Sequence, residues 1–297
     1  MIGTERRVFS IIDVIDPLPR GIEIFDVGAM PEGRPRYAPL LDRSVGSVTA
    51  FEPQEEERRR LESSQARTRC LPTVLGDGRE HTFHVTRYPG CSSLFEPDPL
   101  VIDAFFGIGA ADRTGNFHVE RTLRLGTERL DDVPDLPQPD LLKLDIQGAE
   151  LLVLTHGSRL MSRALVVEAE AEFVALYRDQ PLFGDLHRFM ADQGFWLHRL
   201  ENMQGRCYRP FATDDPSRAV SQPLWCDAVF VRDPGRLHRW SDDDLVVGAT
   251  ILHECYGSCD LALRLLTAFD DRRRTGRATA YLAALKADGP IAAAYPR

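Results

Sequence analysis

The chain has 297 residues, of which 43% are hydrophobic and 27% charged, as in a soluble globular protein with one large domain and an appendage, or with two domains. The formal net charge of −9 disfavours nucleic acid as the main partner, because phosphate backbones are usually bound by a basic face. No apolar run approaches the roughly 20 residues that cross a bilayer. The amino-terminal segment also lacks the features of a signal peptide.

The six cysteines show no regular zinc-site spacing. Cys255 and Cys259, with His253 nearby, form only a weak metal candidate, because a second pair of ligands is missing. We therefore expect reduced thiols and a cytoplasmic protein.

The first half of the chain alternates short apolar runs with a charged helix. Residues 21–27 and 47–51 predict strands, and residues 54–63 predict a helix with acid-first i,i+4 pairs. A third apolar run, 70–75, precedes Gly76-Asp77-Gly78, and residues 82–87 alternate like a strand.

The second half continues the pattern as far as residue 232. Residues 141–146 and 164–167 predict core strands, with a helix opening at 147–150 between them. A helix at 181–193 stops at Gly194. Two further strands, 195–200 and 226–232, could pair directly at one edge of the sheet.

The chain changes to helices alone after Pro234-Gly235. Ser241 and Asp244 form a capping box, and helices are expected near 242–256, 259–272 and 276–287. The fold class is therefore α/β, with a doubly wound, mostly parallel, Rossmann-like sheet and a C-terminal α-helical extension. We expect an N-terminal segment at 1–20, the sheet domain at 21–234 and the helical extension at 235–297.

Chemistry in such a fold is expected at the carboxyl ends of the strands, where the strand order reverses. Asp26 and Gly28 end the first strand, and Glu52 ends the second, 24 residues after Gly28. This is close to the spacing of an acid that receives ribose hydroxyls. A contact with the helix dipole would also explain Glu52. The chain lacks the G-x-G-x-x-G fingerprint, which disfavours a nicotinamide dinucleotide.

A third group of acids follows the strand at 141–146. Asp145 and Glu150 flank the turn into the next helix, and either could orient or deprotonate a substrate hydroxyl. Glu150 is equally well explained by its place in the first turn of a helix. Asp145 is explained less well in that way, because an acid at a buried strand end is costly without a partner.

Several segments together resemble the FkbM family of S-adenosylmethionine (SAM)-dependent methyltransferases. The resemblance rests on Phe25-Asp-Val-Gly-Ala29, Phe51-Glu-Pro53 and, most specifically, Leu142-Lys-Leu-Asp-Ile-Gln-Gly-Ala-Glu150, and it covers roughly residues 20–232. Cys91-Ser-Ser-Leu94 and Leu176-Tyr-Arg-Asp-Gln-Pro-Leu-Phe183 also match. One departure is Met30-Pro31-Glu32-Gly33, where many members carry Asn followed shortly by Gly.

The resemblance implies a class I methyltransferase fold, SAM as cofactor, and O-methylation of a glycan or a small-molecule natural product. It implies a cofactor site formed by the residues Asp26, Gly28, Ala29, Glu52, Pro53, Asp77 and Asp145. For catalysis we expect Asp145 as the base, supported by Glu150 or Glu168. We expect no metal, no nucleic acid and no membrane span; a homo-oligomer is compatible with the sequence.

Three alternatives stay open at this point. The base could be one of four histidines, His84, His118, His156 or His253. A divalent metal held by Asp145 and a second carboxylate could acidify the hydroxyl instead. The reshaped loop at Met30–Gly33 would also be consistent with a non-catalytic scaffold or regulator that kept the fold.

Overall fold

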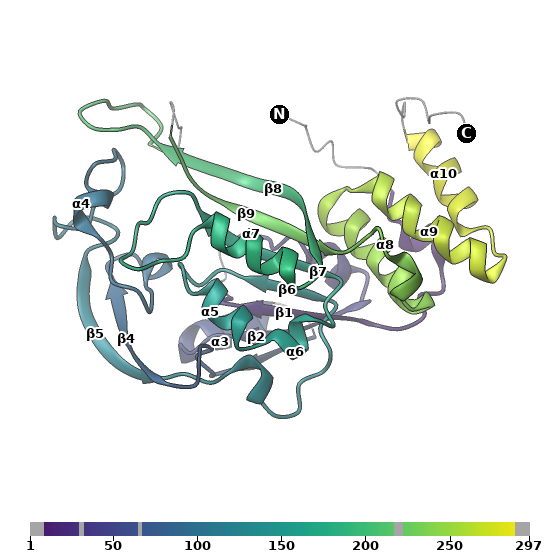
Figure 1. Ribbon diagram of the computed structural model, residues 1–297, viewed down its shortest axis with the longest axis horizontal. Helices are drawn as coiled ribbons and strands as arrows, with labels where there is room; N and C mark the ends of the chain where they lie inside the picture. Colours follow the sequence, from purple (N-terminus) through teal and green to yellow (C-terminus); the bar gives the residue numbers. More distant parts are fainter. Residues whose placement is uncertain (1–8, 30–32, 65–66, 217–221, 289–297) are drawn as a thin grey trace. The chain divides into compact units, whose positions relative to one another are not determined.

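The protein is described by a computed structural model that covers residues 9–29, 33–64, 67–216 and 222–288. Its main sheet has seven strands in the order β3-β2-β1-β6-β7-β9-β8 (Figure 1). These strands are β1 Ile22–Val27, β2 Gly46–Phe51, β3 Thr68–Leu71, β6 Leu141–Leu144, β7 Val166–Glu172, β8 Phe195–Arg206 and β9 Gln222–Arg232. The pairs β2–β3, β1–β6 and β6–β7 are parallel, and β9 is antiparallel to both neighbours. This is the mostly parallel α/β sheet that the sequence predicts.

The strand order reverses between β1 and β6. From β1 the chain adds β2 and β3 on one side and later returns to place β6 on the other. The helices that connect or follow these strands are α2 Ala38–Asp42, α3 Glu55–Ser64, α5 Glu150–Thr155, α6 Ser158–Met161 and α7 Phe183–Asp192. The expected site of chemistry is therefore the carboxyl ends of β1 and β6.

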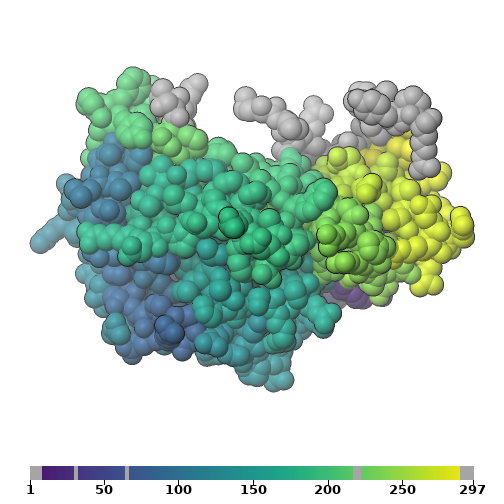
Figure 2. All heavy atoms as spheres, viewed as in Figure 1, coloured from purple at the N-terminus to yellow at the C-terminus, as the bar shows by residue number. Residues whose placement is uncertain are grey.

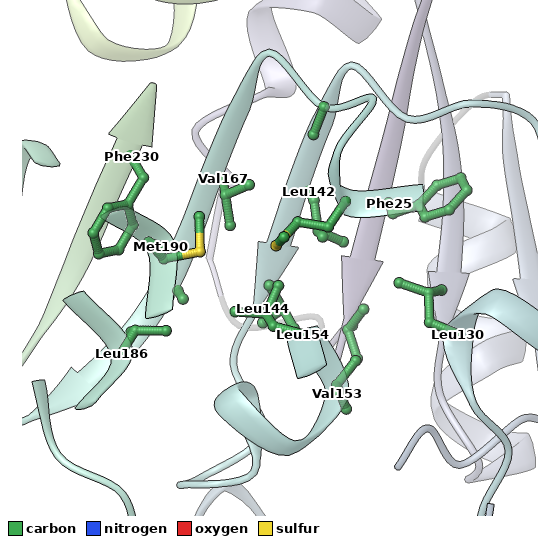
Figure 3. Packing of buried hydrophobic residues seen from close by; sticks show 14 of the residues in the cluster. Phe25, Leu130, Leu142, Leu144, Val153, Leu154, Val167, Leu186, Met190 and Phe230 are labelled. Carbon is green, nitrogen blue, oxygen red and sulfur yellow. The ribbon is translucent and has the colours of Figure 1, made fainter. Parts of the chain in front are cut away.

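One face of the sheet carries the apolar core (Figure 3). Side chains of β1, β6, β7 and β9 pack there against side chains of α5 and α7. The strand residues include Phe25, Leu142, Leu144, Val167 and Phe230, and the helix residues include Val153, Leu154, Leu186 and Met190. In the space-filling view from the same side as Figure 1, atoms of the helical layer cover the strands behind them (Figure 2). Because successive side chains of a strand point to opposite faces, the residues between these apolar ones lie on the other face of the sheet.

A second, smaller sheet lies in the long segment between β3 and β6. It consists of β4 Glu80–Thr86 paired antiparallel with β5 Val119–Gly126. The strand expected at 82–87 is thus real, and β5 was not anticipated because its outer residues are largely charged. The other short elements of this segment are η1 Pro89–Cys91, α4 Pro99–Ile102 and η2 Leu130–Asp132.

Several strand boundaries differ from the prediction. The strand expected at 226–232 begins at Gln222, and the one expected at 141–146 ends at Leu144. The third strand spans Thr68–Leu71 rather than 70–75, because only this part pairs with β2. The strand expected at 164–167 extends to Glu172, because β9 pairs with it over its whole length. Likewise β8 continues to Arg206 rather than stopping at 200. Cross-strand pairing, which local hydrophobicity does not report, sets these ends.

The chain forms two compact units. One contains Ile24–Pro31 and Val48–Arg232; the other contains Met1–Glu23, Glu32–Ser47 and Asp233–Arg297. The second unit includes α1 Ile12–Ile15, η3 Leu237–Arg239, α8 Asp242–Tyr256, α9 Cys259–Arg273 and α10 Arg277–Asp288. The C-terminal helices are confirmed, and Ser241 and Asp244 make the predicted capping box. Independent domains with boundaries near residues 20 and 234 remain a proposal.

Among the residues that the structure describes, none of the helices has the length and apolar character needed to cross a membrane.

Candidate active site

The turn after β1 lies directly against the end of β6. Gly28 has a φ of +78°, and a Cβ atom at this position would lie 2.1 Å from the main-chain oxygen of Asp145. The N–H of Asp145 donates to the carbonyl oxygen of Val27 at 3.0 Å. Only glycine accommodates both the left-handed φ and the close backbone. The ends of β1 and β6, where the sequence predicts site residues, therefore lie next to each other.

A row of charged side chains crosses the sheet on the face opposite the apolar core. Asp26 of β1, Lys143 of β6 and Glu168 of β7 occupy adjacent register positions. Lys143 Nζ lies 3.1 Å from Asp26 Oδ1. Desolvation lowers the pKa of Lys143, but the carboxylates of Asp26, Asp145 and Glu168 outweigh it and raise that pKa. Asp26, with 4% of its surface exposed, is thus held mainly by Lys143.

A second row lies one step nearer the carboxyl ends of the strands. Asp145 and Glu170 both accept hydrogen bonds from Gln147 Nε2, at 3.2 and 2.7 Å. Glu170 stands opposite Asp227 of β9 in the sheet register. Desolvation, followed by repulsion from Asp145 and Glu172, raises the pKa of Glu170 well above the ordinary carboxyl value. The half-buried Asp145 therefore lies beside a carboxyl whose protonated form is favoured.

Glu150 closes the turn between β6 and α5. Its Oε1 accepts the N–H of Ile146 at 2.7 Å, and 3% of its surface is exposed. Desolvation raises the pKa of Glu150 to about 7, although hydrogen bonds from its own backbone N–H and from Ile146 oppose the shift. The carboxylate is directed at this turn, so it shapes the loop that presents Asp145 and Gln147.

Glu52 stands at the end of β2 as expected. Its Oε1 accepts the N–H of Gln54 at 2.7 Å, and Pro53, which follows it, is exposed. Desolvation raises the pKa of Glu52 to about 7. Ala29, after the Gly28 turn, is buried, and Met30, Pro31 and Glu32 lie outside the described residues.

Asp77 lies in the loop after β3, away from the two charged rows in sequence. Its Oδ1 lies 2.7 Å from His81 Nε2 and accepts the N–H of Arg79 at 3.0 Å. Desolvation works to raise its pKa, but the hydrogen bonds from His81 and Arg79 lower it. Asp77 is thus an ionised carboxylate whose first oxygen is already bound.

Three residues beside the candidate site were not predicted from the sequence. Lys143 was read only as part of a motif, although a lysine inside an apolar strand is a signal for a buried charge partner. Glu170 looked like a residue beyond the strand because the strand was predicted to end at 167. Tyr177 Oη contacts Gln147 Oε1 at 3.0 Å, a pairing that no local pattern could indicate.

The four histidines make other contacts. Ring nitrogens of His118 and His156 lie near the carbonyl oxygens of Ala110 and Leu152, at 3.1 and 2.9 Å. His253 belongs to the other unit and pairs with Tyr281 Oη at 2.8 Å. His84 Nδ1 is buried and, among the described residues, has no hydrogen-bond partner. The hydrogen bonds of His118, His156 and His253 therefore go to groups other than Asp145 and Glu170.

Within 9–29, 33–64, 67–216 and 222–288, no group of three or more histidine, cysteine or acidic side chains is arranged to hold a metal ion. All six cysteines are free thiols.

A hollow of about 530 Å³ lies in the segment before β5, lined by Asp103, Gly109, Asp112, Asn116 and Arg209 among others. Asp103 accepts the N–H groups of Ala110 and Ala111, so its carboxylate holds the loop together. None of the predicted site residues lines this hollow.

A parallel sheet with a glycine turn after its first strand, an acid ending its second and the order reversed between β1 and β6 defines a Rossmann-like, cofactor-binding protein. The model of the methyltransferase FkbM domain matches residues 26–197, more than half of the chain. The chain belongs to the FkbM methyltransferase family. This confirms the resemblance seen in the sequence.

Solved structures show weaker similarity. A TehB-like SAM-dependent methyltransferase from Corynebacterium glutamicum is 12% identical, with 75% of this chain and 85% of that chain covered and a TM-score of 0.34. Magnesium protoporphyrin IX methyltransferase from Synechocystis, solved with bound SAM, is 13% identical, with 72% and 71% covered and a TM-score of 0.31. At TM-scores this low, neither similarity supports a statement about this chain. A search of curated proteins finds no match.

The cofactor of this family member is SAM, and the site residues fit it. Gly28 adds no side chain of its own at the end of β1 and packs closely against the backbone of Asp145 and the side chain of Ile146, so main-chain groups are presented there to an amino-acid ligand. Glu52 has one carboxylate oxygen on the N–H of Gln54, and a carboxylate can accept several further hydrogen bonds. The acidic face around Asp145 favours a cationic sulfonium electrostatically.

Proposed function

We propose that this methyltransferase transfers the methyl group of SAM to a hydroxyl oxygen of a glycan or a small-molecule natural product. The observation that carries the proposal is the contact between the Gly28 turn and Asp145. It sets a half-buried carboxylate beside the strand end assigned to the methionine part of the cofactor. A hydroxyl is a weak nucleophile, and a base at this position is what its methylation requires.

When bound, SAM supplies an electrophilic methyl group, so that alignment of the acceptor oxygen is the main task of the protein. Asp145 accepts the hydroxyl proton as the new carbon–oxygen bond forms. The acceptor oxygen becomes more positive during transfer, and the carboxylate of Asp145 beside it favours that change. Lys143 pairs with Asp26 and offsets part of the negative charge of this face.

The remaining roles are assigned by position. Asp26, Gly28 and Ala29 lie around the methionine end of SAM. Glu52, followed by Pro53, receives the ribose hydroxyls, and Asp77 lies near the adenine. Glu150 and Glu168 act on Asp145 indirectly, as positioning residues, through the β6–α5 turn and through Lys143.

The test is methyl transfer from SAM carrying a ¹³C-labelled methyl group to a panel of sugars, glycosides and polyketide-type alcohols. We expect a methyl ether, recognised by the carbon shift of its methyl signal in a two-dimensional NMR spectrum. Transfer to nitrogen or carbon would contradict O-methylation. Tight SAM binding in isothermal titration, without transfer to any member of a panel that includes extracts of the source organism, would favour the non-catalytic alternative.

A further inference from the structure

The side-chain amide of Gln147 is in hydrogen-bonding contact with three neighbouring side chains. Its Nε2 donates to Asp145 Oδ1 and Glu170 Oε2, and its Oε1 faces Tyr177 Oη at 3.0 Å. The hydroxyl of Ser93 donates to its main-chain oxygen at 2.7 Å. Gln147 also has a φ of +57°, a backbone region that is unfavourable for residues other than glycine. A strained backbone kept by four contacts indicates a functional position.

In this arrangement the hydroxyl of Tyr177 lies beside more acceptor oxygens than it has protons to donate. A phenol carries one proton, yet Tyr177 Oη lies 2.9 Å from the carbonyl oxygen of Cys91 and 3.0 Å from Gln147 Oε1. One proton cannot satisfy two carbonyl-type acceptors at full strength. Tyr177, with 1% of its surface exposed, has no access to bulk water that would relieve the second oxygen.

Reversing the amide of Gln147 gives each of these three contacts one donor and one acceptor when Glu170 is protonated. One Nε2 proton is then donated to Tyr177 Oη, the phenol donates to the carbonyl oxygen of Cys91, and the Glu170 hydroxyl donates to Oε1. Asp145 Oδ1 loses the donor that it has in the other orientation. When Glu170 is ionised, the orientation described above is preferred, because a carboxylate needs the amide donor.

We propose that Gln147 is a proton-linked positioning residue, whose side-chain amide reverses its orientation when Glu170 takes up a proton. Glu170 titrates among several neighbouring groups from α5, β7, β9 and the loops that follow β6 and β7; these are Asp145, Glu150, Glu172, Tyr177, Cys226 and Asp227. The acids among them disfavour a negative charge on Glu170 and so favour its protonated form.

The reversal changes what surrounds Asp145. With Glu170 protonated, the amide donor turns away, and Asp145 Oδ1 is released to accept a proton from an acceptor hydroxyl. With Glu170 ionised, the same oxygen is occupied by Gln147. Methyl transfer should then fall as the pH rises through the titration of Glu170. This consequence rests on the proposed function, whereas the reversal itself does not.

The reversal can be observed without any acceptor. In protein labelled with ¹⁵N-glutamine, the side-chain amide signal of Gln147 is assigned by its loss in Gln147→Met. We expect this signal to titrate between pH 5 and 9, with a midpoint well above that of an ordinary glutamate. Glu170→Gln donates permanently to Oε1, so the signal should stay at its low-pH position throughout. The exposed Glu120→Gln on β5 is the matched control and should leave the titration unchanged.

Tyr177→Phe provides the second test. It keeps the ring but removes the oxygen that accepts from the reversed amide, so the protonated arrangement loses a partner. The midpoint should fall by about 0.5–1 pH unit, as the loss of one neutral hydrogen bond implies. A signal that does not titrate, a titration that survives Glu170→Gln, or a midpoint that stays or rises in Tyr177→Phe would each overturn the proposal. If the NMR results hold and no acceptor is methylated, only the proposed function fails.

Discussion

The two faces of β7 show how one strand serves both stability and chemistry. One face enters the apolar core through Val167, Ala169 and Ala171. The other carries Glu168, Glu170 and Glu172, next to Lys143 and Asp145 of β6. Apolar side chains on the first face are stabilised by leaving water, whereas carboxyl groups on the second are desolvated and repel one another. The second face is therefore expected to reduce stability, as functional sites commonly do.

The largest expected effect concerns the acidic face. Asp145→Asn keeps the shape of the side chain and removes its charge and basicity. Turnover should fall about 10²–10⁴-fold while SAM affinity is retained, because general-base catalysis contributes about that much. Single-turnover methyl transfer and isothermal titration measure the two quantities. Near-full turnover would place the base elsewhere, and loss of SAM binding would place Asp145 in the cofactor site.

Moving a charge to the other face tests the comparison directly. Ala169 is fully buried, and Ala169→Glu would leave an unpaired carboxyl in the core. We expect a loss of about 4 kcal/mol in the free energy of unfolding, the range for an uncompensated buried charge. Denaturant unfolding measures it. The matched variant Glu170→Gln, one residue away on the acidic face, should cost less than about 1 kcal/mol. Equal losses would contradict the division of roles.

Lys143 is the cation that the acidic face depends on. Lys143→Met should lower the free energy of unfolding by about 2–3 kcal/mol, below the full cost of breaking a buried pair because part of this side chain is exposed. It should also weaken SAM binding, because Asp26 loses the cation that is paired with it. Lys143→Arg keeps the charge and should restore most of the affinity. A loss that Lys143→Arg does not restore would mean that Lys143 acts only in packing.

The smallest expected effects concern Glu52, where stability and SAM binding should depend on pH with opposite signs. Because the pKa of Glu52 is raised from 4.5 to about 7, the folded protein binds more protons than the unfolded chain between these values. The stability of the free protein therefore falls as the pH rises through this window. SAM binding should change in the opposite direction, since ribose hydroxyls donate best to the ionised carboxylate.

Glu52→Gln should remove the pH dependence of SAM binding and the part of the pH dependence of stability that Glu52 contributes. Glu150, whose pKa is also raised to about 7, keeps its own part. At pH 8 Glu52→Gln should weaken SAM binding about tenfold and raise the thermal stability of the free protein. Isothermal titration and thermal unfolding at pH 6 and pH 8 measure the two effects. Glu55→Gln, on the exposed face of α3, is the control. Unchanged SAM affinity in Glu52→Gln would remove this residue from the cofactor site.

Some features could be predicted because they depend on neighbours in the sequence. Alternating apolar residues indicated β1, β2 and β6, and Gly194 and Ser241 marked a helix stop and a helix start. The ion pairs Glu55–Arg59 and Glu56–Arg60 follow from helical spacing alone. Since parallel strands end at one edge, acids that follow strands could be assigned to a common site before any contact was known.

Other features depend on partners that are distant in the chain. The end of β7 at Glu172 is set by β9, and β5 exists because it pairs with β4. Lys143 meets Asp26 although the two residues are 117 positions apart, and Tyr177 reaches Gln147 from a loop 30 residues away. Hydrogen bonds and desolvation act over a few ångströms in space, whatever the separation in sequence. The amino-acid sequence by itself thus determined that Asp26, Glu52 and Asp145 lie at the carboxyl ends of strands, and only the tertiary structure decided where the other strands end and which side chains share protons and charge.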